Sequence, residues 1–104
     1  MPRREMHLCP VCGRKHIKDH MTLHHLLPAL GHIEKSEPTI YICETCHQVI
    51  HYCHTNEQLR FYFNTLELIL RSKKIQSMLQ LYKYKSDNCV FRIKRLKDLK
   101  KRSA

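Results

Sequence analysis

The stretch CETCHQVIHYCH, residues 43–54, decides the fold of this chain, because it places three cysteines and three histidines within twelve positions. Cys43 and Cys46 have the C-x-x-C spacing of a zinc knuckle. His47 and His51 are four residues apart, which puts both side chains on one face of a helix. One short helix is therefore expected to supply both thiolate and imidazole ligands.

A second C-x-x-C pair, CPVC at residues 9–12, completes a set of four thiolates. Four cysteine sulfurs at about 2.3 Å from one ion make a closed tetrahedral zinc site that contributes folding free energy. The sequence therefore predicts a structural Zn²⁺ with four ligands: Cys9, Cys12, Cys43 and Cys46. Free buried cysteines or a redox pair are the alternatives. Cys53 and Cys89 have no partner at metal spacing, and we expect both to be small buried hydrophobic side chains.

The length of 104 residues favours one domain whose core is too small to dispense easily with a metal. The first residues, MPRREMHLCP, carry charges without the apolar run of a secretory signal. No apolar segment reaches the roughly 20 residues that a membrane span needs. We therefore expect a cytoplasmic protein without a membrane partner, in a compartment where C-x-x-C pairs bind metal more often than they form disulfides.

The net charge of +10 is concentrated in the C-terminal half: residues 1–51 hold six basic and five acidic side chains, and residues 52–104 hold thirteen and four. Such a surface favours nucleic acid through the release of counterions. An anionic membrane surface and a solvated charge run without a partner are the alternatives. The basic tail, residues 90–101, predicts either a helix that lies on nucleic acid or a loosely ordered segment.

Two short strands are expected before the quoted stretch. MTLHHLLP, residues 21–28, predicts a strand that stops at its proline, which cannot donate to a ladder. After a polar loop, TIYI at residues 39–42 combines β-branched residues with a tyrosine and predicts a second strand. A helix is expected to begin near Glu44, whose charge complements the dipole at a helix N-terminus.

Helices are expected after the quoted stretch. Thr55 and Gln58 form a T-x-x-Q capping box that opens one helix. Apolar residues then recur every three to four positions through residues 59–70, which predicts core packing along that helix. A third helix is expected from about Lys73, with an apolar face made of Ile75, Met78, Leu79 and Tyr82.

The remaining histidines of interest are the adjacent pair His24 and His25. Their side chains point to opposite faces of a strand unless the strand ends there. At a strand end, one of them can bind a metal while the other faces a substrate. Together with the helix pair they predict three imidazole ligands with an open coordination position, and a fourth imidazole suited to general-base work. The other histidines are expected at the surface or in local hydrogen bonds: His7, His16, His20, His32 and His54.

The segments CPVCG, TLHHLLP and TIYICETCHQVIH together resemble the HNH endonuclease family, the zinc-bearing branch of the ββα-metal nucleases. The resemblance covers residues 9–54, and HTNEQL with the helices after it resembles the C-terminal part of a small HNH subgroup. It implies an α+β fold. Residues 1–54 would form a ββα-metal core with a Cys₄ zinc site, and residues 55–104 a helical, basic extension of the same domain.

Position by position, the resemblance implies that His25 is the general base. The asparagine of the family's name is missing, and Pro38 or Thr39 stands in its place, so the Thr39 hydroxyl is the candidate support for His25. The implied ligands of one divalent cation are His24, His47 and His51. Mg²⁺, Mn²⁺, Ni²⁺ and Zn²⁺ all remain open as that cation.

The implied activity is metal-dependent hydrolysis of phosphodiester bonds, with double-stranded DNA as the expected substrate. Phosphate contacts are expected from six basic residues: Arg14, Lys15, Lys18, Arg92, Lys94 and Arg95. Two alternatives stay open. The chain is a non-catalytic zinc module that binds nucleic acid, or a nuclease subunit of a larger phage or restriction complex. The number of metals bound per chain, one or two, separates the first alternative from the nuclease.

Overall fold

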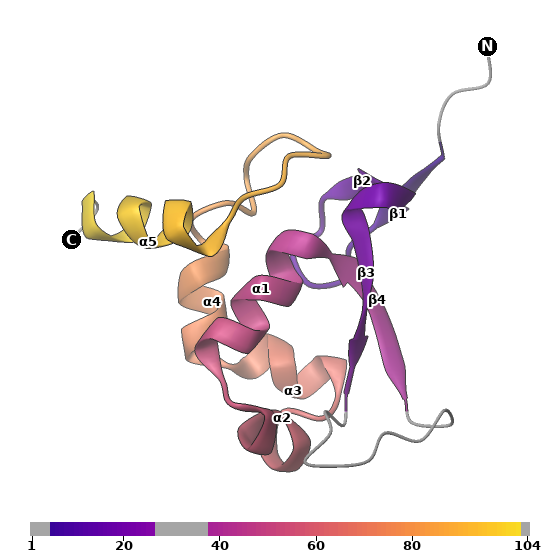
Figure 1. The fold of residues 1–104 in the computed structure, drawn as a ribbon, viewed down its shortest axis with the longest axis vertical. Coiled ribbons are helices and arrows are strands. Elements are labelled where there is room, and N and C mark those ends of the chain that lie inside the picture. The colour runs from indigo at the N-terminus through magenta and orange to yellow at the C-terminus, as the bar shows by residue number, and fades with distance from the viewer. Residues whose placement is uncertain (1–4, 27–37, 103–104) are drawn as a thin grey trace.

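Two antiparallel hairpins come first in the chain, and helices follow them (Figure 1). The computed structural model describes residues 5–26 and 38–102. The predicted α+β class is confirmed, whereas the ββα-metal core stays a prediction. The division at residue 54 into a core and an extension stays a prediction.

The first hairpin carries the first C-x-x-C pair in its turn. Strand β1 (Met6–Leu8) pairs antiparallel with β2 (Lys15–Ile17). Between them Gly13 adopts φ +77°, a left-handed conformation that favours glycine, and its amide donates to the Cys9 carbonyl at 2.8 Å. The tight turn keeps Cys9 and Cys12 at one end of the hairpin.

The second hairpin follows a 3₁₀ turn, η1 (Lys18–His20). Strand β3 (Met21–His25) pairs with β4 (Thr39–Cys43), and its last residue, His25, lies opposite Thr39. Both predicted strands are therefore confirmed where the structure describes them. Leu27 and Pro28, where the first strand was expected to stop, lie outside the described residues.

Helix α1 (Glu44–Cys53) begins where β4 ends, so the helix predicted near Glu44 is confirmed. Its N-cap is Cys43, whose sulfur accepts a hydrogen bond from the Cys46 amide at 3.4 Å. A thiolate at this position satisfies one of the unpaired amides of the first turn. The cysteine knuckle and the start of the helix are thus one structural unit.

The capping box that opens helix α2 (Asn56–Tyr62) is present as predicted. The Thr55 hydroxyl accepts from the Gln58 amide, and the Gln58 side chain accepts from the Thr55 amide, both at 3.1 Å. These two bonds satisfy amides that the helix itself cannot pair.

The prediction of a single helix through residues 59–70 is wrong. Helix α2 ends at Tyr62, and a separate helix, α3 (Leu66–Arg71), follows it. At the break the Asn64 side chain donates to the Arg60 carbonyl, and the Thr65 hydroxyl accepts from the Leu68 amide. Both side chains compete with the continuous helical ladder by satisfying backbone groups locally. The spacing of apolar residues, on which the prediction rested, gives no information about that competition.

Helix α4 (Lys73–Leu79) follows α3 after one residue. Its predicted apolar face is confirmed, since Ile75, Met78, Leu79 and Tyr82 are all buried, although Tyr82 lies in the turns beyond the helix. The basic tail forms a helix, α5 (Ile93–Arg102), which packs against α1, and Leu96 on this helix is fully buried.

The segment between α4 and α5 returns to the first hairpin. Asn88, with φ 64°, donates its amide to the Lys15 carbonyl at 2.7 Å, and its side-chain oxygen accepts from the Ile17 amide at 3.1 Å. Asparagine tolerates this left-handed conformation better than most residues. The open edge of β2 is thereby covered by the C-terminal part of the chain.

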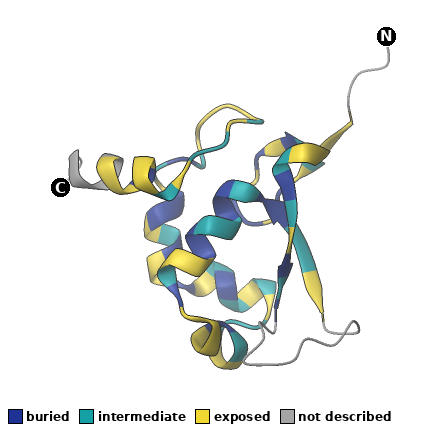
Figure 2. Ribbon diagram, in the orientation of Figure 1, coloured by how far each residue is buried: buried dark blue, intermediate teal, exposed yellow. Residues whose placement is uncertain are grey.

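Helix α1 lies at the centre of the molecule, between the β3–β4 hairpin and helices α4 and α5, and α3 packs against α4 (Figure 1). Buried residues line its inner faces, whereas α2 and residues 93–98 of α5 are largely exposed (Figure 2). In the described part of the chain, no helix has the length and apolar character to cross a membrane.

Candidate metal centres

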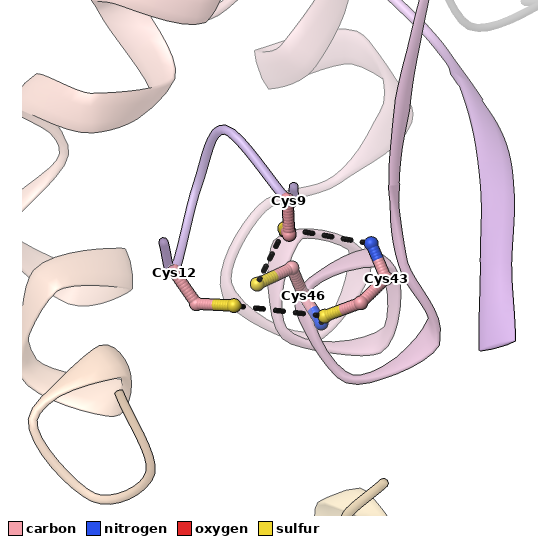
Figure 3. Close-up of side chains that lie close together, drawn as sticks. All are labelled: Cys9, Cys12, Cys43 and Cys46. Carbon is pink, nitrogen blue, oxygen red and sulfur yellow. Dashed lines mark hydrogen bonds between the residues drawn. The ribbon is translucent and has the colours of Figure 1, made fainter. Parts of the chain in front are cut away.

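The four predicted cysteines converge in the structure, with the loop of the first hairpin facing the start of α1 (Figure 3). The Cys9 and Cys46 sulfurs are 3.7 Å apart, and the Cys12 and Cys43 sulfurs are 3.8 Å apart. Four sulfurs held about 2.3 Å from one ion in a tetrahedron lie about 3.8 Å from one another. The buried cluster therefore has the dimensions of a Cys₄ metal site, and zinc fits it.

Hydrogen bonds within the cluster shift the pKa values of its cysteines in opposite directions, and a bound cation would allow all four to ionise. Hydrogen bonds from Cys43, Cys46 and Cys9 lower the pKa of Cys12, whereas the bond with Cys12, followed by those with Cys43 and Cys9, raises the pKa of Cys46. Four adjacent thiols cannot all ionise without a compensating positive charge. Metal binding here would displace the remaining protons and so weaken as the pH falls.

Two buried side chains outside the cluster, Tyr82 and Arg14, would stabilise thiolate forms of its cysteines. Burial, and then the charge of Cys46, raise the pKa of Tyr82, so its hydroxyl stays protonated and donates to the Cys46 sulfur at 3.0 Å. Arg14 is also buried. Burial alone would lower its pKa, but the Cys12 sulfur and the charges of Cys43 and Cys46 raise it above its usual range. A cation beside four thiolates offsets the net negative charge of a Cys₄–Zn²⁺ centre.

A second cluster joins the end of β3 to α1. One nitrogen atom from each of His24, His47 and His51 lies within 4.8 Å of the others. The three ring centroids are 5.0 to 5.3 Å apart. The predicted ligand group is therefore brought together by the fold.

The burial and hydrogen bonding of His24 test whether a metal ion fits the second cluster. It is fully buried, and neither ring nitrogen has a hydrogen-bond partner among the described residues. A buried polar group without a partner costs free energy. Burial, with the nearby His51, His47 and His25, lowers the pKa of His24 to about 3. The ring is therefore neutral at physiological pH, the form that binds metal, and a cation would satisfy its lone pair.

The two helix histidines are also held neutral. Burial, followed by His51 and His25, lowers the pKa of His47. Burial also lowers the pKa of His51, against a hydrogen bond to Asn56 that raises it. Thr22, which sequence reasoning missed, places its hydroxyl 2.9 Å from Nδ1 of His47. Such a contact orients a ligand imidazole.

A groove of about 620 Å³ opens beside the helix histidines. Its walls come from β3, α1 and the segment that precedes α5. The lining residues include Thr22, Glu44, His47, Gln48, His51 and Arg92. A molecule in this groove would contact the exposed side of the histidine cluster, while His24 closes the buried side.

The predicted base and its support lie at the end of the second hairpin where β3 leads into the segment that connects it to β4. His25 is half-buried and is not one of the three clustered histidines, but its charge affects both His24 and His47. Thr39 is exposed and pairs with His25 across the strands. The cross-strand position is the one in which a short side chain can reach its neighbour. Their catalytic roles stay predictions.

The six basic residues expected to bind phosphate occupy different environments. Lys15, Lys18, Lys94 and Arg95 are exposed, and Arg92 is exposed and lines the groove. Arg14 does not belong with them, because only 3% of it is exposed and Nη1 donates to the carbonyls of Ser86 and Cys89 at 3.1 and 2.8 Å. Its charge faces the cysteine cluster and is withdrawn from the surface.

Other histidines and cysteines match their predicted environments only in part. His16 was expected at the surface or in a local hydrogen bond, but it is fully buried and neither ring nitrogen has a described partner. Cys89 was expected to be buried and is exposed, whereas Cys53 is partly buried and packs against the core. His20 bonds Asn88 as expected, and His32 lies outside the described residues.

Compared with protein-family models, with curated proteins and with solved structures, the chain matches none of them. Its geometry therefore has to carry the functional interpretation. That geometry defines a small α+β protein with a buried four-cysteine cluster and a separate histidine triad beside a groove.

Proposed function

We propose that this chain is a metal-dependent endonuclease of the HNH type, which hydrolyses phosphodiester bonds in nucleic acid, with double-stranded DNA as the expected substrate. One observation carries the proposal: His24, His47 and His51 converge beside a groove, and His24 has two buried nitrogens without a described partner. Three imidazoles with an open side are typical of a catalytic divalent-metal site.

The order of elements supports the same proposal. An antiparallel hairpin, β3–β4, leads directly into α1, and ligand-type histidines lie at the end of the first strand and on the helix. This is the order that the HNH resemblance implies. The cysteine cluster joins the first hairpin to the start of α1 and would hold that helix in place.

When bound, a divalent cation would polarise a phosphoryl oxygen and stabilise charge on the leaving 3′-oxygen. The three histidines would hold the cation, and Thr22 would keep the ring of His47 oriented. His25 accepts a proton from the attacking water, and Thr39 supports its ring from the opposite strand. The exposed lysines and arginines of β2 and α5 attract the polyanion.

Two kinds of metal would be bound. Zn²⁺ suits four thiolates, and imidazole suits Zn²⁺ or Ni²⁺ better than Mg²⁺ or Mn²⁺. We therefore expect elemental analysis to find zinc in the cysteine cluster and a second, exchangeable divalent cation at the histidines. One metal per chain under saturating conditions would favour a non-catalytic zinc module.

Single substitutions separate the base from the ligands. General-base catalysis contributes about 10²–10⁴-fold in rate, so His25→Ala should lose cleavage of supercoiled plasmid by that factor while the second metal stays bound. His47→Ala should lower both cleavage and metal affinity. His7→Ala, at a half-buried position on β1, serves as the control and should retain both.

The products should carry 5′-phosphate and 3′-hydroxyl ends, because water attacks and the 3′-oxygen leaves. If His25→Ala cleaved at the wild-type rate, with His47→Ala inactive to exclude contaminating nucleases, the proposed base would be wrong. If the purified wild type bound two metals but cleaved neither DNA nor RNA, the proposed nuclease activity of this chain would be wrong.

A further inference from the structure

The three residues that precede and open α5 are fixed to α1 by two hydrogen bonds. The Phe91 amide donates to the Thr45 hydroxyl at 2.9 Å, and the Ile93 amide donates to the Gln48 side-chain oxygen at 3.3 Å. Thr45 is fully buried, so its hydroxyl is shielded from competing water. The backbone on both sides of Arg92 is therefore held in place.

Packing beneath this segment adds to the two bonds. The guanidinium of Arg14 lies 5.6 Å from the centre of the Phe91 ring, and Leu96 is fully buried one turn further along α5. Lys97 lies over the Tyr52 ring of α1 at 5.5 Å. These contacts make Arg92 part of the folded body and not part of a loose basic tail.

The Arg92 side chain lines the same groove as His47 and His51. It is exposed, and no ion pair joins it to another residue in the described part of the chain, although Glu44 lines the groove as well. A guanidinium binds phosphate through paired hydrogen bonds of fixed geometry. Its fork is therefore available to a ligand beside the histidine cluster.

We propose that Arg92 binds a phosphate group of the strand being cleaved, next to the histidine cluster, and that Thr45 and Gln48 position it for this task. The inference rests on the proposed nuclease function and assigns a substrate contact within it. It separates Arg92 from Lys94 and Arg95, whose exposed charges act on the polyanion at longer range.

Steady-state cleavage of a short duplex by the metal-loaded protein tests the inference. Arg92→Gln should lower kcat roughly 100-fold, the loss typical of removing one donor to a developing negative charge. Arg92→Lys should recover part of it, because charge returns without the fork. Arg71→Gln removes the same charge from an exposed site at the end of α3 and is the matched control, with kcat unchanged.

Binding tests the contact without catalysis. In the His47→Ala background, without added divalent cation, fluorescence anisotropy of the same duplex should show about tenfold weaker binding for Arg92→Gln, as expected for the loss of a charge-assisted hydrogen bond. Thr45→Val removes only the hydroxyl that holds Phe91. It should reproduce part of both losses while the zinc content stays at the wild-type level.

The outcomes are distinguishable from failure of the proposed function. If the wild type cleaves nothing, the nuclease proposal fails before any variant is compared. If the wild type cleaves and Arg92→Gln behaves like Arg71→Gln in kcat and in binding, the nuclease stands and the phosphate contact is wrong. If Thr45→Val matches the wild type while Arg92→Gln is impaired, the proposed positioning role of Thr45 is wrong.

Discussion

Thr22 shows how a single hydroxyl can determine which nitrogen of a histidine is available to a metal. Its oxygen donates to the Ile42 carbonyl at 3.4 Å and lies 2.9 Å from Nδ1 of His47. We assign the tautomer of His47 in which the hydroxyl proton is directed to the carbonyl and Nδ1 donates to the Thr22 oxygen. Nε2 of His47 is then left with its lone pair free for a cation.

Removal of the Thr22 hydroxyl should therefore weaken the histidine site without disturbing the cysteine site. Thr22→Val should lower the affinity for the second divalent cation about 10- to 100-fold, the range found when a partner of a ligand histidine is lost. Titration calorimetry on zinc-loaded protein measures this directly. Thr22→Ser keeps the hydroxyl and should bind nearly as well as the wild type, whereas equal affinities for Val and wild type would refute the assigned tautomer.

At the scale of the element, α1 contributes residues to both the cysteine cluster and the histidine cluster. Cys46, Val49 and Ile50 are fully buried, while His47 and His51 face β3 and the groove. Neighbouring positions on a helix differ by about 100° in direction, so adjacent Cys46 and His47 serve different sites. A helix this short has little stability in isolation, and tertiary contacts must hold it.

The cysteine cluster should supply much of that support. Cys12→Ser should remove zinc and lower the free energy of unfolding by more than about 4 kcal/mol, the size expected for loss of a structural metal. Thermal unfolding with parallel zinc analysis checks the prediction. Cys89→Ser, at an exposed position outside the cluster, should leave both quantities nearly unchanged. Similar small shifts for the two variants would argue against a structural metal.

At the scale of the whole molecule, His54 connects helices that are distant in sequence. Its Nδ1 donates to the Gln58 side-chain oxygen at 3.3 Å, its Nε2 accepts from the Ser72 hydroxyl at 2.7 Å, and its ring stacks on Phe63. The Gln58 oxygen only accepts, which requires a proton on Nδ1; burial lowers the pKa of His54 and favours the neutral ring, in which Nε2 then accepts from Ser72. The junction therefore uses the neutral imidazole.

Acid should weaken this junction. Burial lowers the pKa of His54 below its ordinary value of 6.5; the Gln58 hydrogen bond opposes this shift and the charge of Lys74 adds to it. Between the two pKa values the unfolded chain binds a proton that the native protein excludes. The contribution to stability is present above pH 6.5 and is lost as the pH falls through the lower, native pKa.

His54→Gln should therefore reduce the slope of unfolding free energy against pH between about 7 and 5, by at most about 1.4 kcal/mol per pH unit. Urea unfolding at saturating zinc, repeated across this range, gives the slope for both proteins. An unchanged slope in the variant would mean that His54 titrates alike in the folded and unfolded chain.

What the sequence by itself determined are the features that depend on near neighbours. C-x-x-C spacing, the i, i+4 histidines and the capping box each involve residues within a few positions, so their local geometry follows from the backbone. The convergence of His24 with the helix histidines was also predicted, because the HNH resemblance implies it, and the fold brings the three side chains together. The break near Thr65 was missed because side-chain bonds to the backbone overrode apolar periodicity.

Only the tertiary structure decided where the second half of the chain lies on the first. Asn88 reaches back to β2, and Thr45 accepts from Phe91, across separations that no local pattern encodes. The role of a charged residue also could not be read from the sequence alone. Arg14 and Arg92 are both arginines in a basic chain, but packing buries one behind the cysteines and presents the other to the groove. Burial arises from contacts with distant residues, so the same side chain becomes a structural cation or a surface one only when the chain has folded.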